Sequence, residues 1–513
     1  MSKLKLSFPL SFTSETVFDI TIYIGFLIFV LALPFGYSTV FLNIGLSLVL
    51  IGWVGRMVSE RKLGWQRTPL DIPIALFLGL AFIACFLAPH PATSSLGYFW
   101  KLLRAILLFY AVIHSRLGSR WKHVVIAFIA AAGISSVLGL WYYANDTRLA
   151  IDFMGRVGLQ FKEELDGANN PDLQISEDFR AELRACNVPL SENVSISPSN
   201  RLPNEWRIND PARQRRYMIR PNETHLMVYM IEQRLTGTFK MPNDLGVYLA
   251  LSLPFVMGYF VVSWRRDPKQ KYRIWRILGL GAVVIVMSAN LVLTLTRAAW
   301  VSTIIATAFL GVYFIVIALR KLDAEYGLWK RILLGSTIIL VLLSLSLFLV
   351  PQHIKARFQT MIEHPVGFMG ERPQWWQTSL ELIRKYPFTG IGLGRFRYEY
   401  QNSGPPEQYN VPYHAHNIYL HIAVEHGIPS LLLFMWIMVI IYQQVFAGRQ
   451  ANDFWGSGTF IGASGFLISA LVYGLADNIL HQRTVLLFYF IIGIIFYTNL
   501  LKDKKHEKKT ETG

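Results

Sequence analysis

Residues 484–501 near the end of the chain read TVLLFYFIIGIIFYTNLL, a block without a charged side chain, and Lys502-Asp503-Lys504-Lys505 follow it at once. A helix of this length crosses the hydrocarbon core of a bilayer, which is about 30 Å thick. Apolar blocks of similar length recur along the whole chain, so we predict an all-α polytopic membrane protein with about twelve transmembrane helices. The predicted spans lie near residues 17–36, 38–54, 70–88, 98–114, 123–143, 243–263, 275–295, 298–319, 332–350, 428–446, 457–476 and 484–501.

The composition agrees with a membrane protein and argues against nucleic-acid binding. The chain has 513 residues, of which 53% are hydrophobic and only 16% are charged. Its formal net charge is +16, a value that basic nucleic-acid-binding domains also reach. Here, however, the positive residues occur in short clusters between apolar blocks, as topology signals do. We therefore expect a lipid bilayer as the surroundings of this chain and no nucleic-acid partner.

The short connections orient the spans. Basic clusters follow the second, fourth, sixth and eighth predicted spans and the last one, as at Arg61-Lys62 and Arg320-Lys321. All of them fall on one side when the spans alternate, and the positive-inside rule makes that side the cytoplasm. Both termini are then cytoplasmic, and two large loops lie on the opposite face. The predicted parts are spans 1–5 at 1–143, a loop at 144–242 expected to form a partly helical subdomain, spans 6–9 at 243–350, a second loop at 351–427, and spans 10–12 with a basic tail at 428–513.

Four arginines stand where bilayer physics discourages charge. Arg234 precedes the sixth span, Arg297 has almost no loop to lie in between the seventh and eighth, Arg372 opens an amphipathic helix with two tryptophans, and Arg395 follows a glycine-rich turn. Arginine offers fixed donors that match phosphate oxygens in pairs. The alternative is that these side chains reach the headgroups and that the tryptophans anchor the helix at the interface.

A histidine cluster lies before the tenth span. Four of the twelve histidines, among them His414 and His416, fall between residues 414 and 426. Histidine titrates near physiological pH and can take a proton from an attacking hydroxyl. A zinc site is the rival, but no HExxH motif or second ligand group at metal spacing supports it, so we expect neither a metal nor another cofactor. Packing and capping roles for these histidines remain a further alternative.

The arginines and a histidine are therefore expected to meet on the outer face. Arginines would hold a leaving diphosphate while histidine acts as the base. These residue types therefore predict a membrane enzyme that acts on a phosphorylated lipid.

The second half of the chain also resembles the O-antigen ligase and polymerase superfamily, the Wzy-C type of membrane glycosyltransferases. The family's ligases carry a histidine, then Asn, Ser or Gln, then nine residues and a glycine, and His416, Asn417 and Gly427 fit that spacing. The Thr294-Leu-Thr-Arg297 element and the turn that begins at Pro387 are also similar to family features. The resemblance runs in order from about residue 234 to residue 427, and the twelve-span layout fits it.

The resemblance implies a reaction and a location. A glycan would move from undecaprenyl diphosphate to an acceptor hydroxyl, with inversion, on the periplasmic face of the bacterial inner membrane. His416 would be the catalytic base, and the acceptor would be the lipopolysaccharide core or another glycan. The residues expected to contact the substrates are Arg234, Arg297, Arg372, Arg395, Asn417 and His414. Two features depart from the pattern: Ala298 stands where many relatives have glycine, and the 144–242 loop is long.

The competing enzyme functions differ in the acceptor of the glycan. Ligation of O-antigen to lipid A-core is the favoured prediction, and an O-antigen or exopolysaccharide polymerase and a protein O-oligosaccharyltransferase share its donor and chemistry. A bicarbonate-type solute transporter is the alternative from another class, and it should place ionisable residues near the membrane midplane. The spans are nearly uncharged there except for Lys101 and Arg104, which either attract the donor's phosphates near the outer surface or only reach the headgroups.

Overall fold

A computed structural model gives the arrangement of the chain. It describes residues 14–62, 64–87, 93–144, 152–154, 177, 180, 194–198, 206–210, 215–221, 226–231, 234–265, 272–321, 372–403, 412–448, 453–480 and 482–511. Eight of the described helices are long and apolar enough to cross a membrane, and three shorter apolar helices accompany them. An all-α polytopic membrane fold is thereby confirmed for the membrane part.

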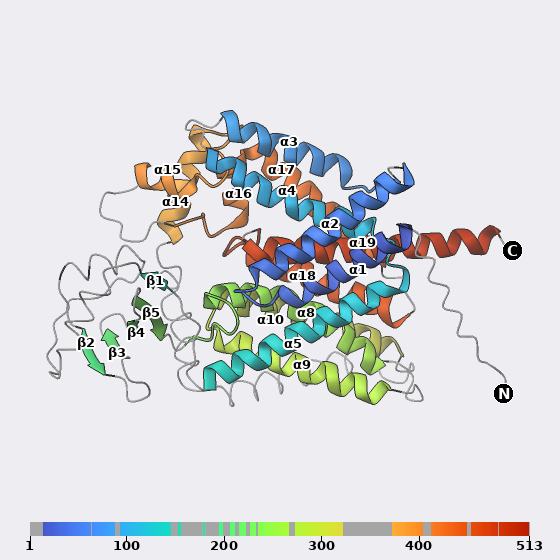
Figure 1. Ribbon diagram of the computed structural model, residues 1–513, viewed down its shortest axis with the longest axis horizontal. Helices are drawn as coiled ribbons and strands as arrows, with labels where there is room; N and C mark the ends of the chain where they lie inside the picture. The colour runs from blue at the N-terminus through green and yellow to red at the C-terminus, as the bar shows by residue number, and fades with distance from the viewer. Residues whose placement is uncertain are drawn as a thin grey trace, which may run out of the picture.

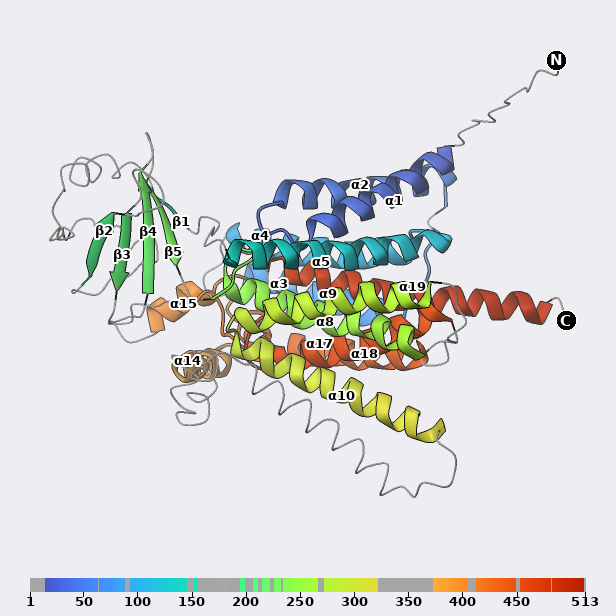
Figure 2. The same cartoon turned by 90° about the horizontal axis from the view of Figure 1, so that it is seen from below.

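Every predicted span except the ninth coincides with a helix, and the ninth, at 332–350, lies outside the described residues. The helices are α1 Ser14–Ala32, α2 Thr39–Glu60, α3 Asp71–Leu87, α4 Thr93–Ile113, α5 Trp121–Ala144, α8 Pro242–Arg265, α9 Arg273–Leu293, α10 Arg297–Lys321, α17 Ile428–Ala447, α18 Phe454–Gly474 and α19 Gln482–Glu511. They run roughly along one direction and form a bundle (Figures 1 and 2).

The centre of the bundle is formed by helices that are largely covered by others. The apolar windows of α8 and α19 are 83% buried and that of α18 is 72% buried, whereas that of α9 is 22% buried. Glycines allow α8 and α18 to approach closely, since a Cβ on Gly258 would lie 2.2 Å from the backbone nitrogen of Gly462. Such close backbone approach through small residues is a common basis of helix packing in membranes.

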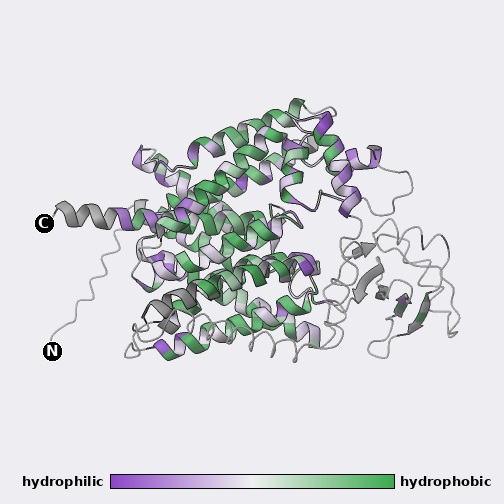
Figure 3. Cartoon of the chain, turned by 180° about the vertical axis from the view of Figure 1, so that it is seen from behind, coloured by the Kyte–Doolittle hydropathy of each residue, from purple (hydrophilic) through white to green (hydrophobic). Residues whose placement is uncertain are grey.

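The two ends of the bundle differ. The first long loop's sheet and the short helices α14 Arg372–Lys385, α15 Phe396–Ser403 and α16 Ile418–His426 lie at one end, which we call the loop end. The last turns of α19 extend from the opposite end, and hydrophilic residues concentrate toward both ends (Figure 3). At that opposite end, Arg116 pairs with Glu60 at 2.8 Å and the backbone of Gly118 donates to the Tyr497 hydroxyl. The connection after α4 thus contacts the end of α2 and the helix α19, and the predicted common side of all the basic connections stays a prediction.

The first long loop contains a sheet that was not predicted. Its strands are β1 Asp152–Met154, β2 Ser195–Pro198, β3 Trp206–Asp210, β4 Arg215–Pro221 and β5 Leu226–Ile231. They form a five-stranded antiparallel sheet in the order β1-β5-β4-β3-β2, with Ile196 opposite Ile208. Apolar and polar residues alternate in β3, and Ile208 is fully buried, as expected for a strand with one covered face. The strands were not predicted because they are short, so their period of two covers few residues, and the expected helical part of the loop stays a prediction.

Candidate active site

The histidine segment meets the connection between α18 and α19 at the loop end. His416 Nδ1 lies 3.0 Å from Asp477 Oδ1, a hydrogen-bond distance. Asp477 comes three residues after α18 ends at Gly474. Sequence reasoning missed this residue because it is 61 positions away from His416. An isolated carboxylate between two apolar blocks was the available hint.

The backbone at His416 has an unusual conformation. Its φ is 46°, in the left-handed region that non-glycine residues seldom occupy. Asn417 follows as the N-cap of α16, with its side-chain oxygen accepting from the backbone N–H groups of Tyr419 and Leu420, and its Nδ2 donates to the Leu475 carbonyl. Asn417 therefore fixes the histidine segment to the α18–α19 connection. Its predicted contact with substrate remains a prediction.

Two aromatic rings contact the imidazole of His416. Trp375 of α14 stacks on the imidazole with ring centroids 4.6 Å apart and an interplanar angle of 29°. The His414 ring lies 4.2 Å from the His416 ring, and Trp376 Nε1 donates to the Ala415 carbonyl at 3.1 Å. The tryptophans that were considered as membrane anchors thus contact the histidine segment, which restricts the rotation of the His416 side chain.

The Asp477 carboxylate is held in its charged form. Burial by itself would raise its pKa, but the hydrogen bond from His416, the nearby charges of both histidines and the N–H of Asn478 together lower the pKa well below the ordinary value. His414 Nδ1 lies 3.6 Å from the same Asp477 oxygen. A carboxylate that stays ionised at neutral pH fixes the imidazole tautomer and stabilises the ring when it takes up a proton.

The same cluster bears on metal binding. Within the described part of the chain, His414, His416 and Asp477 offer three ligand atoms that lie within 4.8 Å of one another. The expectation of no metal rested on the lack of a second ligand group in the sequence, and the fold supplies one in Asp477. Absence of a metal therefore stays a prediction, and a chelator tests it directly.

The predicted arginines are partly brought together. Arg234 Nε donates to the Thr294 carbonyl at 2.9 Å, and its NH2 group donates to the Asn243 side chain. It thereby lies against the Thr294-Leu-Thr-Arg297 element, where the half-buried Arg297 opens α10. Arg372 opens α14, the helix whose tryptophans contact the histidine segment. Arg234 is thus joined to the element that carries Arg297, and Arg372 to the helix that contacts the histidine segment.

Arg395 is engaged elsewhere. Its NH2 group lies 3.8 Å from Glu399 Oε1, and its guanidinium covers the Tyr398 ring at 4.3 Å, both within α15. Its predicted contact with substrate stays untested, and the observed contacts give it a role in holding α15.

The glycine-rich turn wraps around the end of α16. Gly394 N donates to Glu425 Oε2 at 2.8 Å and Phe396 N to Glu425 Oε1 at 3.3 Å. Ile391 N donates to the Val424 carbonyl at 2.8 Å, and Gly390 and Gly394 have positive φ values. A Cβ on Gly390 would lie 2.5 Å from the backbone of Glu425, so only glycine permits this approach. Glu425 is therefore the buried anchor of the turn.

Glu425 makes the stability of this end of the molecule depend on pH. Burial raises its pKa to about 7 against the lowering effect of the backbone donors, from an ordinary value of 4.5. A raised folded-state pKa stabilises the protein below pH 4.5, and this contribution is lost as pH rises through 7, amounting to roughly 3 kcal/mol at 1.4 kcal/mol per pKa unit. We expect the thermal midpoint of the wild type, relative to Glu425→Gln, to fall between pH 5 and pH 8 in detergent.

The exposed Glu381 of α14 offers the matched control. Glu381→Gln should follow the wild type at every pH. A constant difference between the wild type and Glu425→Gln over this range would contradict the buried-acid interpretation.

The fold and the site together define a polytopic α-helical membrane protein with a histidine–carboxylate pair at its loop end. Residues 282–435 match the family model described as O-antigen ligase, Wzy_C. The match covers less than a third of the chain and supports the resemblance to the O-antigen ligase and polymerase superfamily that the sequence motifs predicted, and the matched region contains Arg297, Arg372 and His416. The match does not resolve a branch within that superfamily. No curated protein matches the chain.

Proposed function

We propose that the protein is a metal-independent glycosyltransferase that moves a glycan from undecaprenyl diphosphate to an acceptor hydroxyl, with lipid A-core as the acceptor. The observation that carries the proposal is the hydrogen bond between His416 Nδ1 and Asp477 at the loop end of the bundle. The family match over residues 282–435 supports a glycosyltransferase of the O-antigen ligase or polymerase type.

The pair suits general-base catalysis. Because Nδ1–H donates to Asp477, the other ring nitrogen, Nε2, is left to accept a proton. In the proposed step Nε2 removes the proton of the acceptor hydroxyl while the hydroxyl oxygen attacks the anomeric carbon. The bond from that carbon to the diphosphate oxygen breaks, the diphosphate leaves with the electron pair, and the configuration inverts. The proton stays on His416, and the Asp477 carboxylate stabilises the imidazolium.

The arginines serve the leaving group. Arg234 is positioned by the Thr294 carbonyl and the Asn243 side chain, so its guanidinium is fixed before substrate binds. Together with Arg297 and Arg372 it would hold the diphosphate oxygens, whose negative charge grows as the glycosidic bond breaks. Fixed cationic donors lower the barrier because no reorganisation is needed during the reaction. In this proposal the His416–Asp477 pair activates the acceptor hydroxyl, and the arginines bind the diphosphate of the donor.

A strain that lacks the gene tests the function by the glycolipids that it makes. Loss of long-chain glycan from the lipid A-core, with polymer accumulating on the carrier lipid, is the expected result. Plasmid-borne wild type should restore the ladder on a gel, and an empty vector should not. A core that bears single repeat units would instead identify a polymerase, and unchanged glycolipids would contradict the proposal in favour of a protein acceptor or transport.

A further inference from the structure

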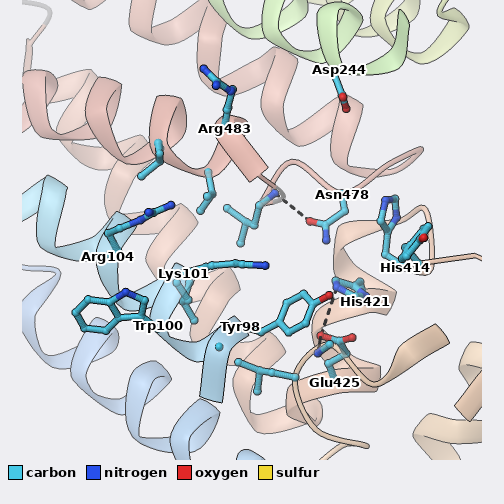
Figure 4. A pocket seen from close by; sticks show the side chains of 18 of the residues that line it. Tyr98, Trp100, Lys101, Arg104, Asp244, His414, His421, Glu425, Asn478 and Arg483 are labelled. Atoms are coloured by element: carbon cyan, nitrogen blue, oxygen red, sulfur yellow. Dashed lines mark hydrogen bonds and ion pairs between the residues drawn. The ribbon is translucent and has the colours of Figure 1, made fainter. Parts of the chain in front are cut away.

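A cavity of about 600 Å³ lies beside the His416–Asp477 pair and belongs to the same site (Figure 4). His414, whose ring lies 4.2 Å from the His416 ring, is among the residues that line it. Two further polar groups line this cavity and have no part in the proposed chemistry: the carboxylate of Asp244 and the side-chain amide of Asn478. Pockets of this size usually orient a ligand through a few such placed polar groups.

The Asp244 carboxylate, in the first turn of α8, has no hydrogen-bond donor or ion-pair partner within the part of the chain that the structure describes. The two cations whose charges reach it are Lys240 and Arg483, and both are engaged elsewhere. Lys240 Nζ lies 5.7 Å from the centroid of the Tyr37 ring, and Arg483 NH1 donates to the Ala32 carbonyl at 3.0 Å. An ionisable side chain in a membrane span usually marks a functional site. Asp244 therefore offers its carboxylate oxygens to a ligand that donates hydrogen bonds.

The Asn478 side chain is held in one orientation. Its Oδ1 accepts from the backbone N–H of Leu480 at 2.9 Å, and its own backbone N–H donates to Asp477 Oδ1 at 2.8 Å. Because Oδ1 is engaged in this turn, Nδ2 is the group that can donate to a ligand. Figure 4 shows Asn478 and Asp244 extending from different elements into the cavity. Asn478 thus provides a fixed donor next to the carboxylate that holds the proposed base.

The sequence neighbours of these two residues belong to the two halves of the proposed reaction. Asn243, which precedes Asp244, accepts from Arg234 NH2 at 2.6 Å, and Arg234 is one of the proposed diphosphate ligands. The residue before Asn478 is Asp477, which lies 3.0 Å from the imidazole of the proposed base. In the proposed reaction the sugar at the reacting bond lies between the diphosphate and the base. The cavity that Asp244 and Asn478 line is adjacent to both.

The chemistry of these groups matches sugar hydroxyls. A carboxylate accepts hydrogen bonds from hydroxyl groups, and an amide N–H donates to hydroxyl oxygens, so adjacent hydroxyls of one sugar ring can satisfy both. Tyr98 and Trp100 line the same cavity, and aromatic rings pack against the C–H faces of sugars. We propose that Asp244 and Asn478 recognise hydroxyls of the sugar at the reacting bond, with Asp244 accepting and Asn478 donating; the inference rests on the proposed glycosyl transfer.

Binding of oligosaccharides to the purified full chain tests this assignment without requiring turnover. The strain that lacks the gene supplies two probes, which are the glycan released from its carrier lipid and the core oligosaccharide released from its lipid A. We expect Asp244→Asn to bind one of them about 10-fold more weakly, since a hydrogen bond to a charged acceptor is lost. Asp453→Asn, at the opposite end of α18, is the matched control and should bind both as the wild type does.

Two further comparisons identify the groups involved. Periodate opens vicinal diols, so the oxidised oligosaccharide should bind the wild type and Asp244→Asn equally weakly. Asn478→Asp keeps the acceptor for the Leu480 N–H but removes the donor, and it should weaken binding of the same oligosaccharide. The thermal midpoint of Asp244→Asn should not fall, because no group in the described part of the chain donates to this carboxylate.

The oligosaccharide that loses affinity identifies the substrate. Weaker binding of the core assigns Asp244 to the acceptor, and weaker binding of the released glycan assigns it to the donor. Unchanged affinity for both, or a wild type that binds neither, would overturn the inference. In an active preparation KM for that substrate should rise with kcat nearly unchanged, whereas a merely structural role would lower kcat and the thermal midpoint together. A chain that binds in this Asp244-dependent way but transfers no glycan would refute the proposed function and not the sugar recognition.

Discussion

We expect His416→Ala to reduce glycan transfer by roughly 10²- to 10⁴-fold, the usual contribution of a positioned general base. The imidazole has no substitute nearby in the same geometry, because His414 shares Asp477 only at 3.6 Å. The measurement is the rate of transfer from lipid-linked donor to acceptor by purified protein in detergent. Expression and membrane insertion should remain close to wild type, whereas the thermal midpoint should fall, because the buried Asp477 carboxylate loses its hydrogen bond from His416.

Two controls separate the base from other roles. His123 lies near the end of the bundle opposite the loop end, where it contacts Tyr23, and His123→Ala should leave the rate unchanged. Added imidazole should restore part of the rate of His416→Ala, because a small base can enter the space that the side chain leaves. Full activity of His416→Ala would eliminate His416 as the base. A wild-type rate that falls with a chelator and returns with zinc would instead show that His414, His416 and Asp477 hold a metal ion.

Asp477→Asn should lower kcat by roughly 10²-fold or more while changing KM little. The amide keeps the size of the side chain, but it removes the charge that stabilises the imidazolium and no longer enforces the tautomer with a proton on Nδ1. Protonation of His416 becomes harder without the carboxylate, so the acid limb of the pH–rate profile should move to lower pH. A purely structural role for Asp477 would reduce stability without moving that limb.

Asp453 provides the matched control, because it precedes α18 at the opposite end of the same helix. Asp453→Asn should leave both kcat and the pH profile unchanged. If Asp477→Asn behaves in the same way, the pair is not the catalytic unit.

The helices could be predicted because each one is specified locally. Spans such as α19 follow from an apolar block and its basic flank, and the structure places a helix at every predicted span that it describes. Burial in lipid requires every backbone polar group to be satisfied within the segment, which leaves the helix as the only choice for a single apolar block. The sheet of the first long loop was missed because its strands of three to seven residues carry little periodic information and their pairing is long-range.

The sequence by itself determined the membrane class, the expected spans and the residue types of the site, since hydropathy, charge and the motif around His416 are properties of neighbouring residues. Only the tertiary structure decided which of these residues meet. Asp477 reaches His416 across 61 positions, Arg395 contacts Glu399 of the helix that follows it, and Lys101 and Arg104 line a cavity together with His414. The physical reason is that such contacts depend on how the helices pack side by side, and the block of residues 484–501 that defines a span says nothing about which neighbour it will cover.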